Sequence, residues 1–147
     1  MHKAAQAGHD AIVKLLINDK KANNIDSKTV EGFTALYRAA QKGHFAVVKT
    51  LANKGADVDA ITEGGETALM QAAQTDEISM MKFLIQKGAN VNKQEFGNNW
   101  TPLIWATYSG YPKAVKVLLD SGAKVDLLSK ESYTALVYAA KVSYICL

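Results

Sequence analysis

The chain has 147 residues, of which 48% are hydrophobic and 21% are charged. This composition is typical of a soluble globular domain, and the length is sufficient to bury a core. The net charge is +3, far from the strongly basic balance of most nucleic-acid-binding domains. No stretch approaches the ~18 apolar residues of a membrane span, and the start MHKAAQAGHD lacks the apolar core of a signal peptide. We therefore expect neither nucleic acid nor a membrane as partner.

The cysteine content sets an expectation about the compartment. Cys146 is the only cysteine, so an internal disulfide is excluded. A reducing compartment is the simplest assumption. We expect a cytoplasmic protein, with the nucleus and the cytosol of a host cell as alternatives, and export by a route without a signal peptide stays open.

Three stretches of the sequence, 33–60, 66–93 and 100–127, align with one another without a gap. The shared threonines are separated by 33, 34 and 33 residues: Thr34, Thr67, Thr101 and Thr134. The shared glycines Gly55, Gly88 and Gly122 are separated by 33 and 34 residues. A fixed period of this length indicates a repeat architecture.

Each repeat predicts the same elements in the same order. A first helix begins after the threonine, whose hydroxyl caps it, and Pro102 occupies a favoured first helical position. Gly43, Asp76 and Gly110 are expected to end it in a left-handed conformation. A second helix follows, and its apolar residues share one face: Ile12, Val13, Leu16, Ile17; Val47, Val48, Leu51; Met80, Met81, Leu84, Ile85; Val115, Leu118, Leu119. The glycines at 55, 88 and 122 then precede turns rich in Asp and Asn.

These motifs closely resemble the ankyrin repeat across essentially the whole chain. The matching segments are TALY, TALM, TPLI and TALV, the Ala-Ala pairs, two Gly-His pairs, and GADVDA, GANVNK and GAKVDL. The resemblance implies an all-α solenoid of helix pairs joined by β-turn fingers, with a concave recognition surface. We expect one domain of about 4.5 repeats, 1–147: a partial repeat 1–25, full repeats 26–60, 61–93 and 94–127, and a half repeat 128–147.

The sequence departs from the family pattern at several points. The family histidine near the start of the first helix survives only as His2, and bulkier residues replace it elsewhere, which predicts apolar packing: Tyr37, Met70, Ile104 and Val137. The first finger, 20–32, is longer, and Asn98-Asn99 adds a residue to the finger of the fourth repeat, which we call the fourth finger. Both changes predict local deviations in finger shape. We expect the apolar tail, Val142 and 144–147, to pack as a short cap, with an exposed end as the alternative.

A search for catalytic, metal and cofactor sites gives none. His9 and His44 share one repeat position, which is a structural explanation for both, and the three histidines and one cysteine lack zinc-site spacing. Glu63 and Glu66 could form an acid–base pair, but a solvated finger tip explains them more simply. A lysine ladder on the second helices, Lys14, Lys49, Lys82 and Lys116, could meet phosphate or only keep the array soluble.

The resemblance implies a partner-binding surface on the finger tips and the exposed side of the first helices. Aromatic residues dominate interface hot spots. On this surface they are concentrated in the last two repeats, and the preceding two repeats form a polar flank beside them. Packing between repeats is the alternative for Trp105 and Tyr138, which share one position and could stack. The predicted partner-binding residues are Phe33, Arg38, Gln41, Lys42, Glu66, Gln74, Phe96, Trp100, Trp105, Tyr108, Tyr133 and Tyr138.

The resulting expectation is a non-catalytic protein–protein interaction module that needs no cofactor and is a monomer. One alternative is the substrate-targeting arm of a larger enzyme or of a ubiquitin-ligase adaptor. Another is an architectural spacer or self-associating array. Fold alone does not name the partner.

Overall fold

The computed structural model describes residues 1–19 and 24–145, with side chains described as far as residue 142. Helices account for all the regular structure of these residues, which contain no β-strand. In chain order they are α1 (His2–Gln6), α2 (Asp10–Asn18), α3 (Ala35–Gln41), α4 (Phe45–Asn53), α5 (Ala68–Gln74), α6 (Ile78–Gln86), α7 (Pro102–Tyr108), α8 (Pro112–Asp120) and α9 (Ala135–Ile145).

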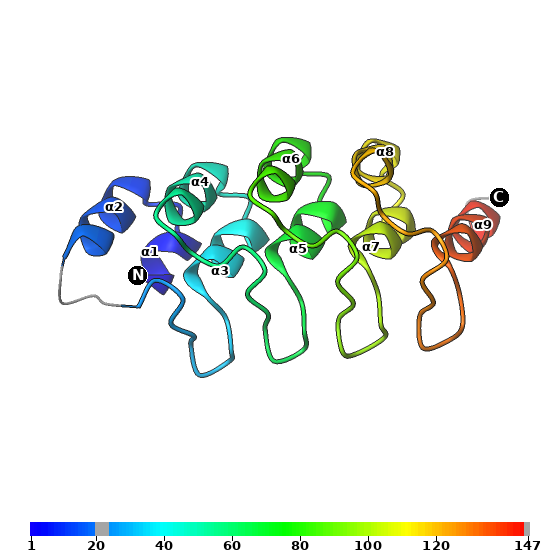
Figure 1. Ribbon diagram of the computed structural model, residues 1–147, viewed down its shortest axis with the longest axis horizontal. Helices are drawn as coiled ribbons and strands as arrows, with labels where there is room; N and C mark the ends of the chain where they lie inside the picture. Colours follow the sequence, from blue (N-terminus) through cyan, green and yellow to red (C-terminus); the bar gives the residue numbers. More distant parts are fainter. Residues whose placement is uncertain (20–23, 146–147) are drawn as a thin grey trace.

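The helices form two parallel rows that run the length of the molecule (Figure 1). The second helices of the repeats, α2, α4, α6 and α8, make one row, and the first helices, α1, α3, α5, α7 and α9, make the other. Each of the first helices α1, α3, α5 and α7 packs on the first helix of the next repeat and on the second helix of its own. The connections between repeats hang as long fingers below the first helices (Figure 1). The predicted all-α solenoid is confirmed.

The threonine caps are confirmed in the three central repeats. The side chains of Thr34, Thr67 and Thr101 accept hydrogen bonds from the N–H groups of Tyr37, Met70 and Ile104, at 3.1, 3.3 and 3.2 Å. These bonds satisfy a backbone donor that a helix start leaves unpaired. The threonines are 0–2% exposed, so the caps are also part of the core.

The expected left-handed residues also occur where each first helix ends. The φ angles are 73° at Gly43, 58° at Asp76 and 75° at Gly110. Position 143 is the equivalent place in the last repeat and holds a serine. There the helix does not end, and α9 runs for 11 residues, whereas α3, α5 and α7 each have 7. The last first helix is therefore longer than the others and lacks the left-handed end at this position.

The bulky residues that replace the family histidine pack as expected in three repeats. Tyr37, Met70 and Ile104 are 1–2% exposed. Val137 differs and is 37% exposed. No further repeat covers it in the described residues. His2 keeps a polar contact, with its Nε2 2.7 Å from the carbonyl oxygen of Ser27.

The longer fourth finger deviates locally, as predicted, and Glu95 spans the additional residue. In the other fingers a hydroxyl at the equivalent position, from Thr29, Thr62 or Ser129, accepts one N–H four residues later. Glu95 is buried, and its carboxylate accepts from the N–H groups of Gly97, Asn98 and Trp100. The Glu95 carboxylate thus accepts three N–H groups in the finger with the additional residue, where a hydroxyl accepts one in each of the other fingers.

Two sequence expectations lie partly outside the described residues. The first finger includes residues 20–23, and the apolar tail includes side chains from 143 onward. Of the tail, Val142 is half-buried.

Candidate recognition surface

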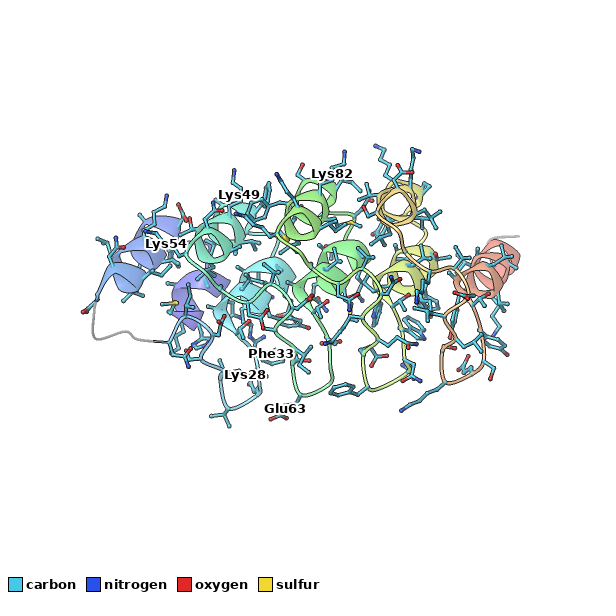
Figure 2. The ribbon with its side chains drawn as sticks, viewed as in Figure 1. Lys28, Phe33, Lys49, Lys54, Glu63 and Lys82 are labelled. Atoms are coloured by element: carbon cyan, nitrogen blue, oxygen red, sulfur yellow. The ribbon has the colours of Figure 1, made fainter. Side chains whose placement is uncertain are left out.

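The fingers and the second helices lie on opposite sides of the molecule. In Figure 2, Lys28, Phe33 and Glu63 lie on the finger side, and Lys49, Lys54 and Lys82 lie along the row of second helices. The predicted partner-binding residues belong to the fingers or to the first helices that adjoin them, except Lys42, which directly follows α3. The fold therefore distributes them along the finger side.

Five aromatic side chains near the C-terminal end form one cluster, which we call the aromatic cluster: Trp100, Trp105, Tyr108, Tyr133 and Tyr138. Trp100 is at its centre. Its ring centroid lies 4.6 Å from that of Trp105, 4.8 Å from Tyr108 and 5.1 Å from Tyr138. Tilted and edge-to-face arrangements at these distances are favourable. Trp105 and Tyr138 do not stack on each other; each packs on Trp100 instead.

Hydrogen bonds fix the centre of the aromatic cluster. The Trp100 Nε1–H donates to the Tyr138 hydroxyl, which donates to Ser129 Oγ, both at 3.1 Å. Tyr138 is 4% exposed, so Trp100 packs on a buried ring. Trp105 is half-buried, and its Nε1 has no partner among the described residues. Ring packing therefore holds Trp105.

Two aromatic rings of this end are open to solvent. Tyr108 is 52% exposed at the end of α7, and Phe96 is 56% exposed at the tip of the fourth finger. Phe96 lies over Gly65, where a Cβ would come within 2.9 Å of its ring. The Phe96 N–H donates to the Gly64 carbonyl at 2.7 Å, and Lys130 Nζ donates to the Phe96 carbonyl at 2.8 Å. The three neighbouring fingers are thus linked to one another at their tips.

The polar flank nearer the N-terminus centres on Phe33 and Arg38. Phe33 stacks on Tyr37 at 5.2 Å, and the Arg38 guanidinium lies 3.9 Å above the Phe33 ring. Arg38 also contacts Glu31 at 2.5 Å and donates to Gln41 at 3.0 Å. Cation–π contact and ion pairing together hold the arginine in one place.

Tyr37 connects this flank to the next finger. Its buried hydroxyl donates to Glu66 Oε2 at 2.5 Å. Burial and the neighbouring Glu66 carboxylate raise the pKa of Tyr37 above its usual range. Glu66 and Gln74 are half-buried, and Lys42 is exposed at the end of α3. The predicted site residues therefore form two groups, an aromatic one and a polar one.

The lysine ladder lies on the row of second helices, and its first and last members form ion pairs with carboxylates. Lys14 lies 2.6 Å from Asp10, and Lys116 lies 3.3 Å from Asp120. Lys49 lies 5.1 Å from the centre of the Phe45 ring. The carboxylates beside its first and last members oppose the continuous positive charge that would favour phosphate binding.

The described residues contain no group of three His, Cys, Asp or Glu side chains that could hold a metal ion. Within the same residues, no helix combines the length and the apolar character that crossing a bilayer requires.

Sequence reasoning missed two residues that position this surface, Glu95 and Ser129. The Glu95 carboxylate accepts the backbone N–H of Trp100 and so fixes the end of its finger. The Ser129 hydroxyl accepts hydrogen bonds from the Tyr138 hydroxyl and from the N–H of Tyr133. The signal for Glu95 was present: it takes the hydroxyl position of the one central finger that has an additional residue.

Comparisons with known proteins agree with this architecture. The sequence matches the family model "Ankyrin repeats (3 copies)" over residues 1–62, 61–129 and 93–146. A stretch of 44 residues, 30% of this chain, is 50% identical to "Ankyrin repeat and SAM domain-containing protein 6" of Rattus norvegicus and 48% identical to the Mus musculus protein of that name. The match covers 5% of the length of each of these relatives. The chain belongs to the ankyrin-repeat family, whose repeats are typically non-enzymatic protein–protein interaction modules.

Proposed function

We propose that the chain binds a protein partner through its finger side, with the aromatic cluster and Phe96, together called the aromatic end, as the anchor. The observation that carries the proposal is the pairing of two exposed rings, Tyr108 and Phe96, with a rigid support. Tyr108 packs on Trp100. The backbone of Phe96 is hydrogen-bonded to both neighbouring fingers, and its ring lies over Gly65. Rings that are already ordered lose little conformational entropy on binding, so their burial contributes to affinity.

The polar flank supplies orientation in this proposal. Arg38 is held by Glu31, Gln41 and the Phe33 ring. A charge fixed in one place discriminates between partners and steers encounter more than it adds affinity. Truncating Arg38 should therefore change the rate of association and its salt dependence, and leave the aromatic anchor intact.

The test is affinity capture from cell lysate with quantitative mass spectrometry. The chain is compared with a Phe96→Ala/Tyr108→Ala double variant and with Val30→Ala, a matched control at a finger tip that is fully exposed. All three should have the same circular dichroism, because none of these side chains is buried. A partner retained by the wild type and the control but lost by the double variant supports the proposal. Equal retention by all three would contradict it.

Two other functions remain as proposals of lower rank. If the chain is the targeting arm of a larger enzyme or ubiquitin-ligase adaptor, the captured proteins should include substrates that the parent protein modifies. If it is a spacer or self-associating array, light scattering should show a mass above that of a monomer, and the proposed anchor should be irrelevant. The single cysteine favours a reducing compartment such as the cytoplasm.

A further inference from the structure

Two glutamine side chains of α5, Gln71 and Gln74, lie between the polar flank and the aromatic cluster. Helix α5 packs between α3 and α7. Gln71 has the same repeat position as Arg38 before it and Trp105 after it, and Gln74 has that of Tyr108. Arg38 and Trp105 both pack on aromatic rings of their own fingers, so the same position places Gln71 beside the finger of its repeat.

The side-chain amide of Gln71 is nearly buried and lacks a hydrogen bond. It is 9% exposed, whereas the side chain of Arg38 in the preceding repeat is 19% exposed. Among the described residues neither Gln71 nor Gln74 has a partner for its amide. Both amides still reach solvent, because the enclosed polar atoms without a partner in this part of the chain are Asp76 Oδ1 and Trp105 Nε1. A buried amide is normally satisfied, so this one has capacity for a ligand.

The polar side chains around the two amides are already engaged. Glu66, in the finger of the same repeat, accepts the Tyr37 hydroxyl at 2.5 Å. In the preceding repeat Gln41, at the position of Gln74, accepts from Arg38 at 3.0 Å. The open hydrogen-bonding capacity in the middle of the finger side therefore belongs to the glutamines of α5.

This capacity matches the main chain of an extended polypeptide. A primary amide donates and accepts at once, and each residue of an extended segment offers one N–H and one carbonyl oxygen. In a folded partner most of these backbone groups are already paired. Single-stranded nucleic acid also combines rings with hydrogen-bonding edges, but the carboxylates of Glu31 and Glu63 are exposed on this side and would repel its phosphates.

We propose that the finger side binds an extended segment of its protein partner. The backbone of the segment pairs with Gln71 and Gln74, and one apolar side chain packs on Tyr108. This inference rests on the proposed function and adds the form of the partner. Packed helices such as α5 and α7 lie about 8–10 Å apart, and an extended chain advances about 3.3 Å per residue. The apolar residue should therefore stand about three positions from the residue that pairs with Gln71.

The probe is a displayed library of random peptides of about 12 residues, which span about 40 Å when extended. It is selected against the whole chain, and one selected peptide is labelled with fluorescein and titrated by fluorescence anisotropy. Gln71→Leu is the test variant. Gln86→Leu is the matched control, since it makes the same change at an exposed position of α6 on the opposite side. Gln71→Leu should be as stable in urea as the wild type, because it removes no hydrogen bond within the chain.

The backbone contact is tested by replacing each amide of the selected peptide in turn with an ester, which removes one N–H. At one or two positions, about three residues from the apolar anchor, the ester should weaken binding by about fivefold, the worth of one hydrogen bond. Gln71→Leu should weaken binding of the unmodified peptide by at least as much. In that variant the same ester should cost nothing further, because both changes remove one shared interaction. Gln86→Leu should bind as the wild type does.

The inference is overturned if no selected peptide binds saturably, if Gln71→Leu binds as the wild type does, or if the ester effect persists in that variant. Loss of stability in Gln71→Leu would make the amide structural and would also overturn it. Displacement of the peptide by single-stranded oligodeoxyadenylate would assign the site to nucleic acid instead.

Tyr108→Ala separates this inference from the proposed function. Loss of peptide binding in both Gln71→Leu and Tyr108→Ala supports the two together. A partner captured from lysate that depends on Tyr108 but not on Gln71 would support the proposed anchor and overturn the extended segment. Peptide binding that depends on Gln71 but not on Tyr108 would support pairing of the segment with the glutamines and contradict the proposed anchor.

Discussion

The polar flank and the aromatic end of the finger side are built on the same repeated helices but are held by different interactions. At one end Arg38 is fixed by a carboxylate, an amide and one ring. At the other, Trp100 is fixed by three rings and one hydrogen bond. Arg38 and Trp105 occupy equivalent positions of their repeats. The comparison shows that the repeat sets where a side chain stands, while the residue at that position decides what holds it.

The largest difference between the two ends should appear in stability. Trp100→Ala removes the centre of the aromatic cluster and should lower the free energy of unfolding by about 3 kcal/mol. Arg38→Ala breaks a partly exposed ion pair and should lower it by less than about 1 kcal/mol. Urea unfolding followed by circular dichroism measures both values. Equal losses would mean that the aromatic cluster is no more tightly built than the polar flank.

A smaller effect should come from the finger that carries Trp100. Glu95→Ala leaves three N–H groups without their acceptor and should cost about 2 kcal/mol. The matched change in the preceding finger, Thr62→Val, removes one such acceptor and should cost about 1 kcal/mol. Amide hydrogen exchange should show faster exchange confined to the fourth finger in the Glu95 variant. Uniformly faster exchange would contradict this local role.

The left-handed residue of each finger offers a further comparison, because its identity differs along the chain. Gly65 has a φ of 81° and lies under Phe96, whereas Ser132 has a φ of 62° in the last finger. Ser132→Gly should stabilise the chain by about 0.5 kcal/mol, since glycine removes the steric strain of a side chain but costs backbone entropy. Gly65→Ala should destabilise it, because its Cβ would displace Phe96. Thermal unfolding distinguishes the two signs, and a stabilised Gly65→Ala variant would contradict the packing described for Phe96.

The last of these effects concerns Tyr37 and depends on pH. Tyr37→Phe should cost about 1 kcal/mol at neutral pH, because it removes the hydrogen bond to Glu66. The pKa of Tyr37 is raised in the folded chain, so its contribution is complete below the unfolded pKa of about 10 and is lost as the pH rises above that value. The stability difference between wild type and variant should therefore shrink above pH 10. A difference that stays constant to pH 11 would show that Tyr37 titrates normally.

The helices, their caps and their left-handed ends were predictable because they recur at one period. Thr34, Thr67 and Thr101 each cap a helix, and Asp76 takes the glycine conformation at the expected place. The identity of the cluster centre was not predictable. Trp100 and Tyr138 stand 38 residues apart, and their hydrogen bond depends on how the longer fourth finger folds around Glu95. A period locates residues along the chain, but it does not give the shape of an irregular finger.

The most direct test of the proposed anchor is photo-crosslinking in cell lysate. A photoreactive phenylalanine derivative replaces Tyr108 in one protein and, as the matched control, Lys49 on the opposite side in another. Both positions are exposed, so both variants should fold. We predict a covalent partner adduct from position 108 and none from position 49. An adduct formed only from position 49 would contradict the account and place the recognition surface on the second helices.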